Sequence, residues 1–142
     1  MTFIANSKNK KSPSPREGFR MGIAVILALL IGGMSAISGS LVLLNNKIPD
    51  YTVLNWLVIY NVIFGAISML AAYFIWKNNS IAKKAVEFIL ASHTFIAIYL
   101  NFFSETVASE SIKAMGFRIG IWILIYLLTY NKFNKEPLNI TK

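Results

Sequence analysis

The sequence contains no cysteine, one histidine and only six acidic residues in 142. The lack of cysteine excludes disulfides, thiolate metal ligands and dithiol redox chemistry. The chain also has no phosphate-binding glycine loop, no GxGxxG or HExxH motif and no cluster of carboxylates. Hydrolytic, redox and metal-dependent catalysis depend on groups of these kinds. We therefore expect a protein that is not an enzyme and that has no cofactor and no metal site.

Charge is scarce as well. Charged residues make up 14% of the chain and hydrophobic residues 56%, whereas an ordinary soluble domain carries about 25% charged residues. Apolar runs long enough to cross a hydrocarbon core, which takes about 20 helical residues, cover residues 19–44, 51–76, 81–103 and 111–130. The sequence therefore predicts an all-α membrane protein in which four transmembrane helices form an up-down bundle.

Little hydrophilic sequence remains outside these four runs. Residues 1–18 combine lysines with a Ser-Pro repeat and have little apolar surface to bury, which is typical of a disordered tail. Residues 131–142 form a second basic tail. The first apolar run exceeds the apolar core of a signal peptide, which is about 7 to 15 residues long, so we expect a retained helix. Any function should then lie in the transmembrane domain, residues 19–130.

The net charge of +8 is distributed unevenly between the connections. Most basic residues precede the first run, flank the second connection or follow the fourth run: Lys8, Lys10, Lys11, Arg16, Arg20, Lys77, Lys83, Lys84, Lys132, Lys135 and Lys142. Cytoplasmic segments of membrane proteins carry such an excess of lysine and arginine. We therefore expect both termini to be cytoplasmic, in a bacterial cytoplasmic (inner) membrane. Anionic lipid headgroups, and not nucleic acid, are the expected partners of these charges.

Small residues recur at helical spacing in two of the runs. Ala28, Gly32 and Ala36 follow one another at intervals of four in the first run, and Gly116 and Gly120 form a GxxxG motif in the fourth. Such spacing lets two helix backbones approach closely, and close packing drives helix association in lipid. We interpret both faces as helix-packing surfaces.

Two uncharged polar side chains are predicted near the middle of the membrane. Asn61 lies about ten residues, or roughly 15 Å, below the outer end of its run, and His93 lies at a similar depth in the third run. Each is explained by a hydrogen bond between helices. The alternative is a ligand contact, in which His93 would accept a proton or bind haem. A bis-histidine haem site would need a second histidine from another subunit, because His93 is the only one.

Arg118 is the one charged residue well inside the fourth run. It lies about seven residues, or roughly 10 Å, below the outer end, so its side chain could extend to the outer headgroups. Alternatively, it faces the bundle. There it could pair with Glu105, stack on the indole of Trp122 or bind an anionic group that enters from outside. Both orientations remain open.

Two functions are compatible with these features. The first is a non-catalytic subunit or accessory protein of a membrane complex or homo-oligomer, because two close-packing faces are more than a four-helix bundle needs. The second is a small oligomeric channel or transporter with a polar intramembrane site around Arg118, Asn61 and His93. In the second case these three side chains should converge on a water-accessible cavity. We favour the first.

Overall fold

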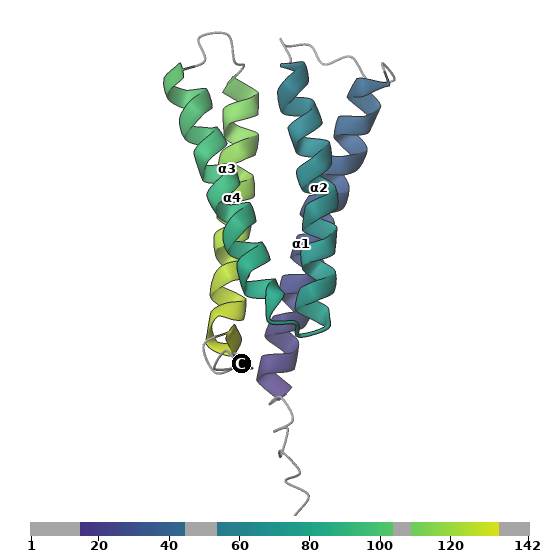
Figure 1. Cartoon of the computed structure of the whole chain (residues 1–142), viewed down its shortest axis with the longest axis vertical. Helices are drawn as coiled ribbons and strands as arrows, with labels where there is room; N and C mark the ends of the chain where they lie inside the picture. The colour runs from purple at the N-terminus through teal and green to yellow at the C-terminus, as the bar shows by residue number, and fades with distance from the viewer. Residues whose placement is uncertain (1–14, 45–53, 104–108, 134–142) are drawn as a thin grey trace, which may run out of the picture.

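The computed structural model describes residues 15–44, 54–103 and 109–133. These residues form four α-helices: α1 (Pro15–Leu43), α2 (Asn55–Trp76), α3 (Ile81–Phe103) and α4 (Ser109–Phe133) (Figure 1). Each helix is long and apolar enough to cross a membrane. The predicted all-α membrane fold with four candidate transmembrane helices is therefore confirmed.

The helix bounds differ from the predicted runs by up to four residues, at the starts of the first and second helices. α1 begins at Pro15 instead of residue 19, so the end of the predicted N-terminal tail is helical. Proline suits a first helical turn, because the N–H that it lacks would have no helical partner there. α2 begins at Asn55 instead of 51, and α4 is slightly longer than its predicted run. The remaining tail residues, 1–14 and 134–142, lie outside the described residues.

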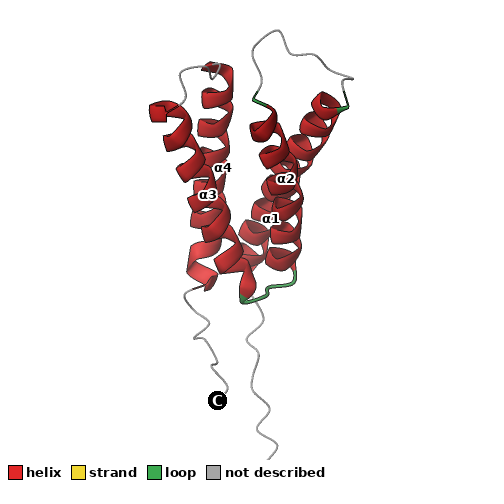
Figure 2. Cartoon of the chain, turned by 45° about the horizontal axis from the view of Figure 1, so that its top comes forward, coloured by secondary structure: helices red, strands yellow, loops and turns green. Residues whose placement is uncertain are grey.

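The helices pack in a ring in which α1 and α3 each contact α2 and α4. Contact is most extensive between α1 and α2, and least extensive between α2 and α3. Figure 1 shows two helix pairs, α1 with α2 and α3 with α4, that lie close together at the end where α1 begins and spread apart toward the other end. Figure 2 shows the same spreading from a tilted view. We call these the convergent end and the divergent end.

Two buried apolar clusters stabilise the bundle. The larger cluster joins all four helices toward the convergent end and includes Ile75, Val86 and Trp122. The smaller cluster lies toward the divergent end and consists of Leu57, Leu100 and Met115, from α2, α3 and α4. α1 contributes no buried residue to the smaller cluster. Among the described residues, α1 therefore buries no large apolar side chain at the divergent end.

Glycines bring α1 and α2 into close contact. A Cβ atom added to Gly32 would lie 2.8 Å from the carbonyl oxygen of Gly65, and one added to Gly65 would lie 2.7 Å from the backbone nitrogen of Ala36. Both distances are too short for a real side chain, so the two backbones touch where only glycine fits. Ala28 is fully buried on the same side of α1. The small residues predicted to pack in the first run thus lie against α2 of the same chain.

Candidate functional site

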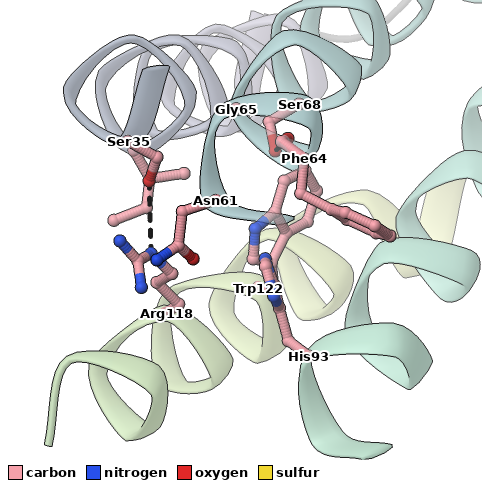
Figure 3. Close-up of a pocket in the computed structure, with 9 residues that line it drawn as sticks. Ser35, Asn61, Phe64, Gly65, Ser68, His93, Arg118 and Trp122 are labelled. Atoms are coloured by element: carbon pink, nitrogen blue, oxygen red, sulfur yellow. Dashed lines mark hydrogen bonds between the residues drawn. The ribbon is translucent and has the colours of Figure 1, made fainter. Parts of the chain in front are cut away.

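Polar side chains from all four helices meet between the two apolar clusters (Figure 3). We call this set the polar layer; its members are Ser35, Asn61, His93, Arg118 and the indole of Trp122. The Nε atom of Arg118 donates a hydrogen bond to Ser35 Oγ across the α1–α4 contact, with 3.2 Å between the two atoms. The guanidinium group therefore points into the bundle. Of the two predicted orientations, the structure has the inward one.

His93 is bonded to a tyrosine of the neighbouring helix. Its Nδ1 atom lies 2.8 Å from the hydroxyl oxygen of Tyr60, and only 3% of His93 is exposed. The ring of Phe64 packs on both side chains, with centroid distances of 4.3 Å to Tyr60 and 5.6 Å to His93. This hydrogen bond joins α2 and α3, the adjacent helices with the least contact. It accounts for a buried polar histidine without a ligand.

Tyr60 is a polar contact that the sequence analysis missed. Tyrosines of membrane helices are usually found at the two interfaces, as Tyr130 is near the end of α4. Tyr60 instead lies next to Asn61, in the second turn of α2. That depth was the available signal that its hydroxyl needs a partner within the bundle.

Two buried polar atoms of the layer lack a hydrogen-bond partner among the described residues: Asn61 Oδ1, an acceptor, and Trp122 Nε1, a donor. Trp122 is fully buried. In the view of Figure 3, the amide of Asn61 lies between the guanidinium of Arg118 and the indole of Trp122. An unpaired buried polar group costs about 1–3 kcal/mol. Such atoms at a polar site are typical of positions that a ligand or an ordered water completes.

An open cavity of about 140 Å³ lies on the divergent side of Arg118, between α1, α2 and α4. Its polar lining consists of Ser35, Ser38, Asn61, Glu110, Ser111 and Arg118. On the convergent side, a second pocket is lined by Asn61, His93, Arg118 and Trp122 among others, and it has no room for a water molecule. Arg118 and Asn61 line both spaces, so they form the floor of the open cavity. His93 lies below this floor.

The other residues singled out from the sequence lie away from the polar layer. Gly116 and Gly120 are exposed on α4, and an added Cβ atom at either position would meet nothing within 4 Å. They therefore do not pack against the described helices of this chain. Residues on opposite faces of a helix are about half a turn apart, which explains why Arg118 points inward while both glycines point outward. Glu105, the predicted partner of Arg118, lies outside the described residues.

Metal ligands do not gather in the described part of the chain. Residues 15–44, 54–103 and 109–133 contain no group of three histidine, cysteine, aspartate or glutamate side chains that could hold a metal ion. The chemistry that the polar layer offers is hydrogen bonding and positive charge. No protein-family model, curated protein or solved structure matches this chain.

Proposed function

We propose that this chain is a small channel or transporter that binds a hydrophilic solute in the cavity above Arg118. The observation that carries the proposal is the inward orientation of the guanidinium group, which lines an open cavity together with Asn61. Inserting an arginine into a membrane helix costs at most about 2.5–3.5 kcal/mol, the value at the helix centre. The hydrogen bond to Ser35 uses one donor of the guanidinium group, and the open cavity beside it leaves room for a solute that accepts from the same group.

The two spaces around the polar layer fit one state of a transport cycle. The cavity on the divergent side is open, and the pocket on the convergent side is closed by Asn61, Phe64 and Trp122. The large apolar cluster then fills the convergent end. A solute could enter from the divergent end and reach Arg118, but it could go further only after the layer rearranges. A solute site between transmembrane helices that is open to one side at a time is typical of transporters.

We further propose that the four helices form an up-down bundle in a bacterial cytoplasmic membrane, with both termini in the cytoplasm. The charges of the described residues support this orientation. Basic residues gather toward the convergent end: Arg16, Arg20, Lys77, Lys83, Lys84 and Lys132. The first turns of α4, at the divergent end, carry Glu110 and Lys113. By the positive-inside rule the convergent end is cytoplasmic, and the cavity then opens to the outside.

Cysteine labelling tests whether the cavity admits water from outside. The chain has no cysteine of its own, so each variant carries a single thiol. Ser38 lines the cavity. Its neighbour Ile37 is 64% exposed on the bundle surface, where lipid would surround it. Because the two positions differ by roughly 1.5 Å in depth, Ile37→Cys is a matched control for Ser38→Cys.

In sealed vesicles with the outer face exposed, a membrane-impermeant thiol reagent should modify Ser38→Cys at least about tenfold faster than Ile37→Cys, since thiolates form in water and not in lipid. Equal, slow rates at both positions would contradict a hydrophilic cavity.

Arg118→Ala should abolish solute binding and flux in liposomes. If neither changes in Arg118→Ala, the channel or transporter proposal is wrong.

A second candidate is a non-catalytic subunit of a homo-oligomer or membrane complex. The observation that favours it is the open face of Gly116 and Gly120, whose spacing suits close contact with another transmembrane helix. The small-residue face of α1 is not available for this role, because it packs on α2. Association through α4 is compatible with the channel or transporter proposal, since small transporters can be oligomers.

A further inference from the structure

We propose that the polar layer is a binding site for a small anion, such as a halide or a short carboxylate, held by the guanidinium of Arg118 and the indole N–H of Trp122. This inference rests on the proposed function, because it names the class of solute that enters the cavity. It is carried by the donor groups of the layer, by the position of Asn61 and by the size of the cavity.

The polar layer offers the donors of Arg118, Trp122 and Ser35, and among the described residues its one unpaired buried acceptor is Asn61 Oδ1. Arginine and tryptophan side chains can donate but cannot accept. Trp122 Nε1 is buried and has no partner among the described residues, so an acceptor placed beside it recovers the lost hydrogen bond. The hydroxyl of Ser35 already lies 3.2 Å from Arg118 Nε. An anion accepts from all of these groups, whereas a cation would be repelled by Arg118 and would leave the indole N–H unpaired.

Asn61 separates the cavity from Trp122. Its side chain lines both the open cavity and the closed pocket, and its amide lies between Arg118 and Trp122 in the view of Figure 3. Because Asn61 Oδ1 has no hydrogen-bond partner among the described residues, no bond from this oxygen holds the amide in its present position. Rotation of the side chain to another rotamer would connect the cavity to Trp122 Nε1. In this proposal, movement of Asn61 opens the path between the two donors.

The dimensions suit a small anion. About 140 Å³ is open above Arg118, where roughly 10–15 Å³ is needed to hold one water molecule. A halide or short carboxylate therefore fits together with several waters of its hydration shell. A guanidinium group binds carboxylates through two parallel hydrogen bonds. The closed pocket below has no room for a water molecule, so any anion reaches Trp122 only after Asn61 moves.

Among the residues that the structure describes, one carboxylate lines the same cavity. Glu110 lies at its rim, exposed to solvent, two helical turns and thus roughly 12 Å from Arg118 along α4. In water, two unit charges at this distance change a binding constant by only about twofold. Glu110→Gln should therefore tighten anion binding by about twofold, and its effect should fade as ionic strength rises.

The fluorescence of Trp122 gives a direct test. The two other tryptophans, Trp56 and Trp76, are exposed on the bundle surface, so Trp56→Phe/Trp76→Phe leaves Trp122 as the only reporter. The full-length variant is reconstituted into neutral lipid vesicles and titrated with iodide, an anionic quencher, with potassium gluconate holding the ionic strength constant. Caesium and acrylamide serve as the cationic and the neutral quencher. Chloride and formate are added as competitors that do not quench.

We expect saturable quenching by iodide, at least about tenfold stronger than by caesium, that chloride or formate relieves and gluconate does not. Arg118→Gln should abolish the iodide effect, and Arg118→Lys, which keeps the charge, should retain part of it. Iodide quenching that is no stronger than caesium quenching, or that persists in Arg118→Gln, would overturn the inference. If Arg118→Gln does not fold, two other results decide whether the anion site exists: the iodide quenching that remains in Arg118→Lys, and the relief of quenching by chloride.

The outcomes separate this inference from the proposed function. If acrylamide quenches Trp122 and Ser38→Cys reacts with the external reagent, but iodide does not bind, the hydrophilic cavity stands and its solute is not an anion. If no quencher reaches Trp122 and Ser38→Cys reacts no faster than Ile37→Cys, both proposals are wrong.

Discussion

The side chain of Arg118 illustrates how a single residue can be explained in two ways until its orientation is known. Arginine has a long apolar stem and a charged head, so at this depth it could extend to the headgroups or turn inward. In the structure it is bonded to Ser35 of α1. Ser35 was not among the residues singled out from the sequence, because a serine in an apolar run is ordinary. Ser35 matters because α4, which faces it, brings the guanidinium group of Arg118 within hydrogen-bond distance of its hydroxyl.

Tyr60 and His93 form the polar contact between the least packed pair of adjacent helices. Tyr60→Phe removes the hydroxyl and leaves His93 Nδ1 buried without this partner. Hydrogen bonds between transmembrane helices contribute about 0.6–1.7 kcal/mol, so we expect the variant to lower the free energy of unfolding by about 1 kcal/mol. Reversible unfolding in detergent micelles measures this loss.

Tyr99→Phe is the control for this prediction, because Tyr99 is 44% exposed on α3. It should unfold like the unmodified protein. If both variants lose the same amount of stability, the hydrogen bond to His93 is not the cause, and the histidine would need another explanation.

At the scale of the elements, the contact between α1 and α2 is the most extensive in the bundle. Gly32→Ala should disrupt it, because the added Cβ atom would lie 2.8 Å from the carbonyl oxygen of Gly65 and 2.9 Å from Ser68 Cβ. Overpacking of this kind typically costs about 1–3 kcal/mol. We expect a corresponding loss in the free energy of unfolding in micelles.

Gly33→Ala is the matched control on the same helix. An added Cβ atom at Gly33 meets nothing within 4 Å, and alanine favours a helix over glycine by about 0.8–1.0 kcal/mol in water. Gly33→Ala should therefore be neutral or slightly stabilising. Equal destabilisation by the two substitutions would show that the close approach of Gly32 to α2 is not the cause of the loss, because helix propensity favours alanine at both positions.

At the scale of the whole molecule, the bundle consists of two helix pairs that separate toward one end. The tight contact of α1 with α2 and the weaker contact of α2 with α3 suit relative movement of the two pairs. The cavity lies in the part of the bundle where they spread. Movement of the α1–α2 pair against the α3–α4 pair would therefore change the width of the cavity and the packing of the polar layer.

Association of whole molecules is predicted to use the outward face of α4. Gly120→Leu would place a large side chain between two close helices and should convert an oligomer into a monomer, as measured by light scattering in a mild detergent. Gly22→Leu on α1 is the control, because Gly22 is also exposed and an added Cβ atom there meets nothing within 4 Å. Should the unmodified protein be a monomer that co-purifies with no native subunit, the second candidate function fails.

The sequence by itself determined the class of the fold, the number of helices and, to within a few residues, their bounds. These features depend on local properties, because the length and hydropathy of each run decide whether it can cross a hydrocarbon core. The predicted depths of Asn61, His93 and Arg118 followed from the same counting along a helix. Their position in one polar layer was foreseen only as one of two alternatives.

The tertiary structure decided which neighbour each polar or small residue meets. Rotation of a helix about its own axis is set by packing against other helices, which no single run encodes. The close approach of Gly32 and Gly65 places the small face of α1 inside the bundle, and the contact of α1 with α4 then brings Ser35 to Arg118. For this reason the arginine lines a cavity between helices, while Gly116 and Gly120 of the same helix are left open to lipid or to another subunit.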